Sequence, residues 1–264
     1  MITLTTDFGT RDWFAGTMKG VILGIQPHAT VVDLTHEIPA GDVRAGAFAL
    51  AAAFRFFAKG TVHVAVVDPG VGSARRAIAV QTQKYFFVGP DNGVLSFALA
   101  REKIKAIHQL TNEKFFRTPV SQTFHGRDVF APVAAHLSRG VPVQKFGPAL
   151  KDFARLDWPQ PRTTRAGIEG VVVYVDCFGN AITNIPNELT QGAGAWVVFT
   201  KGKPICSVEP FYQSVRTGLP VAVPGSSGFL EIAVNGDSAE RKLELRIGYR
   251  VELRARLQNR SSKK

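Results

Sequence analysis

Cysteine and methionine are both scarce in this 264-residue sequence, which has two of each. The cysteines, Cys177 and Cys206, are far apart, so they provide neither a disulfide framework nor the ligand spacing of a structural metal site. We therefore expect reduced thiols, no bound metal and a cytoplasmic location.

Long apolar runs are missing as well. No segment reaches the length that a membrane-spanning helix needs, so we expect no membrane association. The first residues, Met1 to Leu4, begin directly with a strand pattern and lack the basic and apolar regions of a signal peptide. We expect no such peptide.

Acidic residues are fewer than basic ones, 21 against 32, and the formal net charge is +11. Such an excess is compatible with an anionic partner. Several of the basic residues lie together between residues 254 and 264, and the others are scattered. Because no DNA- or RNA-binding motif accompanies them, nucleic acid is not the expected partner.

The first part of the chain alternates strand and helix patterns. Apolar β-branched runs at Ile2 to Thr6, Thr30 to Leu34 and Val62 to Val67 predict strands, and apolar helical spacing covers residues 12–26 and 42–57. This alternation predicts an α/β domain with a mainly parallel sheet flanked by helices.

The pattern changes at residues 159–166, which are polar and rich in proline. Beyond this segment, short strand patterns replace the helical ones and predict a smaller all-β, barrel-like domain. The expected organisation is an α/β catalytic domain over 1–158, a linker over 159–166, a β-barrel domain over 167–258 and a basic tail over 259–264.

Asp68 directly follows the third strand pattern, and Pro69, Gly70 and Gly72 then turn the chain. Open α/β sheets place their chemistry at the carboxyl ends of their strands. Arg75 follows within seven positions, near enough to fold back over Asp68. This segment alone fits a functional site or a capped turn with a solvated arginine equally well.

Two further segments of the first domain have the same character. Asp7 ends the first strand pattern, in Thr5-Thr6-Asp7-Phe8-Gly9. His125 lies just before a predicted helix N-terminus, whose dipole disfavours a charged imidazole. Taken alone, such a histidine is more typical of a surface or capping residue than of a functional one.

The second domain contains two polar segments that are rich in turn formers, residues 176–184 and 225–236. Hairpin turns would explain both. An amide such as Asn180, together with backbone groups at Gly-Ser turns, would also hydrogen-bond an adenine edge. The residues themselves leave both interpretations open.

Together these segments resemble the S-adenosyl-L-methionine (SAM) hydroxide adenosyltransferases, or SAM hydrolases, which are relatives of the bacterial fluorinase and chlorinase. The matching segments cover both domains: Thr5 to Gly9, Thr35 to Ile38, Val66 to Gly72, Pro90 to Gly93, Thr123 to Asp128, Asp176 to Ile185 and Gly225 to Asn235.

The resemblance implies an α/β domain joined to a β-barrel domain and a homotrimer with sites between subunits. It also implies that water or hydroxide attacks the ribose C5′ of SAM in line, giving adenosine and L-methionine. SAM is then the substrate, and no cofactor is expected.

The resemblance further implies a catalytic triad of Asp68, Arg75 and His125. Asp68 would accept a hydrogen bond or proton from the water, Arg75 would keep Asp68 ionised, and His125 would orient the water. The implied substrate-binding residues are Asp7, Phe124, Phe178, Asn180, Ser226, Glu231 and Val234.

Two alternatives remain. The halogenases transfer halide to SAM, but they have tyrosine at the position of Asp68 and Tyr-Ser at that of His125-Gly126, and an anionic Asp68 would repel a halide. A non-catalytic adenosine or SAM sensor would need the binding groups but not a complete triad.

Overall fold

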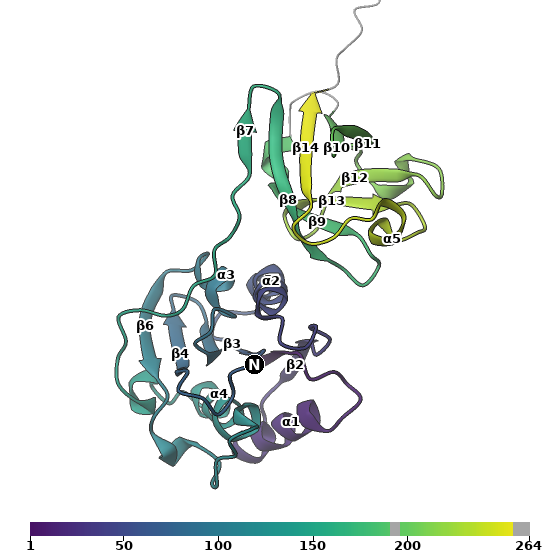
Figure 1. The fold of residues 1–264 in the computed structure, drawn as a ribbon. Helices are drawn as coiled ribbons and strands as arrows, with labels where there is room; N and C mark the ends of the chain where they lie inside the picture. The colour runs from purple at the N-terminus through teal and green to yellow at the C-terminus, as the bar shows by residue number, and fades with distance from the viewer. Residues whose placement is uncertain (191–195, 256–264) are drawn as a thin grey trace, which may run out of the picture. The chain divides into compact units, whose positions relative to one another are not determined.

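The computed structural model describes residues 1–190 and 196–255, which are drawn in colour in Figure 1. The chain divides into two units between Asp157 and Trp158. The predicted basic tail, 259–264, and the last three residues of the predicted barrel domain lie outside the described residues.

A six-stranded mixed sheet forms the first unit, with the strand order β2-β1-β3-β5-β4-β6. Strands β2, β1, β3 and β5 pair in parallel, whereas β4 pairs antiparallel with both β5 and β6. The bounds are β1 Ile2–Thr6, β2 Val31–Thr35, β3 Val62–Val66, β4 Ala77–Thr82, β5 Phe86–Pro90 and β6 Ile104–Gln109. The parallel part contains β1, which is followed by Asp7, and β3, which ends two residues before Asp68.

Helices cover both faces of this sheet (Figure 1). Helices α1 and α4 pack on each other and bury the alternate residues Ile2 and Leu4 of β1, while α2 and α3 pack together on the opposite face. The bounds are α1 Phe14–Ile25, α2 Val43–Ala53, α3 Ser96–Leu99 and α4 Ala131–Ser138, with single turns η1 Phe54–Phe56, η2 Glu113–Phe115, η3 Gly126–Phe130 and η4 Val143–Phe146. In the described part of the chain, no helix is both long enough and apolar enough to span a bilayer.

The second unit is a nearly closed antiparallel sheet with the order β11-β10-β14-β8-β9-β13-β12, and β7 pairs with β8. A bridge between Val208 and Ala222 joins its two ends. The bounds are β7 Arg162–Thr164, β8 Gly167–Val175, β9 Ala181–Pro186, β10 Trp196–Thr200, β11 Lys203–Ser207, β12 Pro220–Pro224, β13 Phe229–Val234 and β14 Arg250–Ala255, with helix α5 Ala239–Leu243 and turns η5 Asn187–Thr190 and η6 Tyr212–Ser214. Strand β7 lies inside the segment that the sequence assigns to the linker.

Strand β9 occupies part of the polar segment for which turns were one interpretation. Its polar side chains are buried, and each bonds to a backbone carbonyl. Thr183 Oγ1 donates to Leu230 O at 2.8 Å, and Asn184 Nδ2 donates to Pro159 O at 2.8 Å. Satisfied in this way, a polar side chain is tolerated inside a sheet. The turn is therefore confined to the residues before Ala181.

A buried histidine lies on the α2 side of the first sheet. His63 in β3 has no exposed surface, and its Nδ1 lies 2.8 Å from the hydroxyl of Thr3 in β1. The rings of Phe54, Tyr85 and Phe87 surround it. Burial lowers the pKa of His63 from 6.5 to about 4, so the native state holds a neutral imidazole.

This histidine predicts a loss of stability in mild acid. Because the pKa is lower in the folded state than in the unfolded state, the stabilisation is complete above pH 6.5 and falls as the pH drops toward 4. The change from pH 7.5 to 5 amounts to about 2 kcal/mol. Urea unfolding at both pH values measures it. In His63→Phe, which keeps a ring but cannot titrate, the pH dependence should be smaller by that amount; equal slopes in the two proteins would contradict the assignment.

Candidate active site

Asp68 and Arg75 form a bidentate ion pair just after β3. Nε of Arg75 donates to Oδ1 of Asp68 at 2.9 Å and to Oδ2 at 3.0 Å, and Nη2 also donates to Oδ2. The side chains are only 5% and 11% exposed. An arginine–carboxylate pair in this geometry is strong and directional because two parallel N–H groups meet two oxygens.

The same guanidinium group contacts His125. Nη2 of Arg75 lies 2.8 Å from Nδ1 of His125. Because a guanidinium group can only donate, Nδ1 must accept, and the proton of the neutral ring is then on Nε2. Burial and the charge of Arg75 lower the pKa of His125, with the charges of Asp68 and Asp128 opposing them. The arrangement therefore favours a neutral imidazole with a donor at Nε2.

A glycine brings the two segments of the triad together. Gly72 has a φ of +77°, and a Cβ there would lie 2.3 Å from the carbonyl oxygen of Gln122. Only glycine allows both this conformation and this approach. The loop after Asp68 thus packs directly against the segment that leads to His125.

Asp128 stabilises that second segment. It is fully buried, accepts a hydrogen bond from the backbone N–H of Ser121 at 2.9 Å, and accepts two from the guanidinium of Arg127. It lies in the π-helical turn η3, immediately after His125. Such turns recur at functional sites because they alter the direction of neighbouring side chains.

A cavity of about 400 Å³ opens beside the triad within the first unit. Asp7, Asp68 and His125 line it. Oδ2 of Asp7 accepts a hydrogen bond from Gly41 N at 2.8 Å, which fixes the carboxylate. The predicted acids at two strand ends thus lie at one cavity.

Aromatic rings form the apolar wall of this cavity. Phe8, Phe14 and Phe124 line it, and their ring centroids lie 5.2–5.8 Å apart. Phe124 also belongs to the core cluster of the first unit, so it serves packing and cavity at once. The wall suits an apolar or sulfur-containing group.

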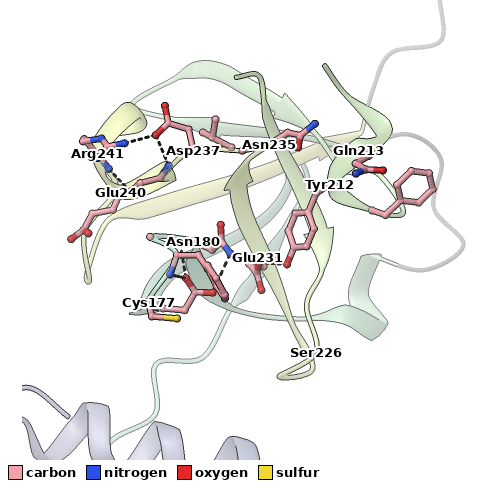
Figure 2. Close-up of a pocket in the computed structure, with 17 residues that line it drawn as sticks. Cys177, Asn180, Tyr212, Gln213, Ser226, Glu231, Asn235, Asp237, Glu240 and Arg241 are labelled. Carbon is pink, nitrogen blue, oxygen red and sulfur yellow. Dashed lines mark hydrogen bonds and ion pairs between the residues drawn. The ribbon is translucent and has the colours of Figure 1, made fainter. Parts of the chain in front are cut away.

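A second cavity, of about 1040 Å³, lies in the C-terminal unit (Figure 2). Every C-terminal residue predicted to bind substrate lines it: Phe178, Asn180, Ser226, Glu231 and Val234. Phe178 is 74% exposed, so it is not a core residue and is available for stacking.

Asp176 organises one wall of this second cavity. Its Oδ1 accepts from the backbone N–H groups of Phe178 and Asn180, both at 2.9 Å, and its Oδ2 accepts from Asn180 Nδ2 at 3.1 Å. These bonds fix the orientation of the Asn180 amide. The sequence-based selection did not include Asp176, although an aspartate just before a Phe-Gly-Asn turn is a signal for such a role.

Tyr212 and Glu231 meet in the same cavity, where Glu231 lies beside Asn180 (Figure 2). The phenol donates to Oε1 of Glu231 at 2.5 Å. Glu231 is only 5% exposed; burial and the charge of Asp176 raise its pKa, and the bond from Tyr212 acts in the opposite direction. Burial and this bond raise the pKa of Tyr212. The sequence-based selection missed Tyr212, which lies in the single turn η6 and has no motif around it.

Metal ligands do not gather at either cavity. Across residues 1–190 and 196–255, no group of three or more His, Cys, Asp or Glu side chains is placed to hold a metal ion. Both cysteines are free.

The chain matches two family descriptions: SAM hydroxide adenosyltransferase N-terminal domain over residues 2–147, and SAM hydroxide adenosyltransferase C-terminal domain over 170–252. It is 40% identical to an (R)-S-adenosyl-L-methionine hydrolase of Salinispora tropica, over 96% of this chain and 97% of that one. A fluorinase of Actinoplanes sp. is 28% identical over 95% and 96% of the two chains. The crystal structure of an uncharacterized conserved protein from Thermotoga maritima matches with a TM-score of 0.90 and 37% identity, over 96% of this chain and 100% of that one. The chain therefore belongs to the SAM hydroxide adenosyltransferase family.

Proposed function

We propose that this protein hydrolyses SAM to adenosine and L-methionine by attack of water on the ribose C5′. The observation that carries the proposal is the hydrogen-bonded set of Asp68, Arg75 and His125 beside a cavity that also contains Asp7. Membership of the family and 40% identity to a SAM hydrolase support it.

The chemistry makes one main demand on the protein. The methionine sulfur leaves as a neutral thioether and takes the electron pair of the C5′–S bond, so the leaving group needs little help. The difficult part is to hold a partly desolvated oxygen nucleophile in line with that bond. Overall, water and the sulfonium give adenosine, methionine and one proton.

The geometry supports a separate task for each triad member. The carboxylate of Asp68 accepts a hydrogen bond from the attacking water and draws its proton. Nε2–H of His125 donates to the water oxygen, because Nδ1 is occupied by Arg75. Arg75 holds Asp68 and His125 in their orientations and does not itself contact the water.

The remaining residues bind the substrate. The Asp7 carboxylate accepts hydrogen bonds from the ribose hydroxyls, a task that suits a group with acceptors only. Asn180, Ser226 and Glu231, with the backbone of Val234, hold the adenosine and methionine ends, and Phe178 stacks on an apolar face.

These groups are divided between the two units, and we propose a homotrimer in which the N-terminal unit of one subunit and the C-terminal unit of its neighbour form each site. A closed ring of heterologous contacts allows this division. The free cysteines fit the reducing cytoplasm that we propose as the location.

Oxygen-18 water tests the reaction directly. Incubation with SAM should give adenosine labelled at the 5′ oxygen together with unlabelled methionine, because C5′ is the carbon attacked. Mass spectrometry of both products measures this outcome. Unlabelled adenosine would contradict water attack, and a 5′-halo-adenosine formed in fluoride or chloride would instead support halide transfer.

Substitution of the triad should affect turnover more than binding. Asp68→Ala and His125→Ala should each lower kcat by about 10²- to 10⁴-fold, the contribution that positioned acid–base groups usually make. Calorimetric titration with adenosine should show binding within a few-fold of that of the parent protein. Asp33→Ala removes an ion-paired aspartate of β2 outside the cavity and is the matched control. Undiminished turnover in both triad variants would contradict the assignment.

Subunit mixing tests the shared site. Asp68→Ala inactivates the N-terminal half and Asn180→Ala the C-terminal half, so neither homotrimer turns over at the parent rate. After unfolding and refolding of an equal mixture, roughly a quarter of the sites combine two unaltered halves, and turnover should return to that extent. If each site were built within one subunit, mixing would restore nothing.

A further inference from the structure

Asp91 and Asn92 directly follow β5. They lie at the carboxyl-terminal end of the parallel strands, as Asp68 does after the neighbouring strand β3. The paired residues of β3 and β5 end with Val64 and Val88. Pro90, at the end of β5, has no N–H with which to continue the ladder. The side chains of the two residues that follow take over the contacts with the neighbouring strands.

Asn92 continues the contact toward β3. Its Nδ2 donates to the carbonyl oxygen of Val67 at 2.8 Å, and its Oδ1 accepts from Val94 N at 3.2 Å. Because one partner can only accept and the other can only donate, the amide has a single orientation. Val67 immediately precedes Asp68, so this bond fixes the backbone from which the carboxylate projects.

Asp91 makes the corresponding contact toward β4. Its carboxylate accepts from Nε of Arg76 at 2.6 Å and from Ala154 N at 2.6 Å, and its backbone N–H donates to Arg76 O at 2.9 Å. The carboxylate is 3% exposed. Arg76 immediately follows Arg75, so this pair fixes the other end of the same loop.

We propose that Asp91 and Asn92 are positioning residues for the triad: together they fix both ends of the loop from Asp68 to Arg75. The inference rests on the proposed function, because it takes Asp68 and Arg75 as catalytic. Neither positioning residue is among those that line the cavity beside the triad.

The backbone hydrogen bonds within the loop are short-range. Val71 N donates to Asp68 O at 3.1 Å, and Ser73 N donates to Gly70 O at 3.1 Å. These turns shape the loop but do not tie it to the sheet. A displacement of the Asp68 backbone by about 1 Å would misalign the water and is enough to cost 10²-fold in rate.

Asn92→Ala and Asn92→Asp test the bond to Val67. Both remove the donor, whereas aspartate keeps an acceptor for Val94 N. Both should lower kcat by about 10- to 100-fold with KM changed less than threefold, the result expected when orientation and not substrate binding is lost. If the aspartate variant keeps the parent kcat, only the turn cap matters and the proposal is wrong.

Asn112→Ala is the matched control. Asn112 makes the same two kinds of bond, from Nδ2 to Lys145 O at 2.8 Å and from Lys114 N to Oδ1 at 3.3 Å, but at η2. It should leave kcat unchanged. Thermal unfolding of all three variants separates positioning from general destabilisation: a fall in kcat that merely follows the fall in Tm would overturn the proposal.

Hydrogen exchange measures the positioning without relying on turnover. In Asn92→Ala, amides in the peptide covering residues 67–76 should exchange faster than in the parent protein, and in Asn112→Ala they should not. Faster exchange in a protein that does not hydrolyse SAM would support the positioning role and refute the proposed function. Unchanged exchange together with unchanged kcat would refute the positioning role alone.

Discussion

The arrangement of the candidate active site depends on one cation that serves two partners. The guanidinium of Arg75 donates to the Asp68 carboxylate and to Nδ1 of His125 at once. A guanidinium group has N–H donors and no acceptor, so it meets Nδ1 only as a donor. This contact selects the histidine tautomer and leaves Nε2–H as the donor of the neutral ring. A lysine could neutralise the carboxylate, but it lacks the planar fork that reaches both groups.

Burying such an ion pair costs desolvation free energy unless further contacts compensate for it. The surrounding loop provides such contacts. Asp68 and Arg75 are almost entirely removed from solvent. The guanidinium carbon lies 5.4 Å from the ring centroid of Phe130, in the π-helical turn that follows His125. Gly72 brings the loop into contact with Gln122. The same contacts that shield the Asp68–Arg75 pair from water therefore also set its distance from His125. Burial of the pair and its alignment with the histidine depend on one set of contacts.

Sequence reasoning succeeded where strand ends and spacing carry the information. Asp68 could be placed at the end of a strand because the apolar run before it marks a buried strand. The spacing put Arg75 within reach of Asp68, although the segment alone fitted a capped turn with a solvated arginine equally well. Strand β6, Ile104–Gln109, was not predicted because Lys105 interrupts its short apolar pattern at an edge position. Tyr212 could not be found from the sequence because it bonds to Glu231, 19 residues away, and no sequence motif links the two positions. Contacts between side chains distant in sequence, such as that of Asn92 with Val67, become visible only in the fold.

The net charge of the chain and the charge of its cavities have opposite signs, and the cavities are the better guide to the ligand. The total is +11, yet the carboxylates of Asp7 and Asp68 line the first cavity. Asp176, Glu231, Asp237 and Glu240 line the second, with Arg241 as its cation. A sulfonium and an ammonium group are favoured beside carboxylates, whereas a halide or a phosphate is not. Among the residues that the structure describes, Arg241 is the only lysine or arginine that lines either cavity, and the acids there fit a cationic substrate such as SAM.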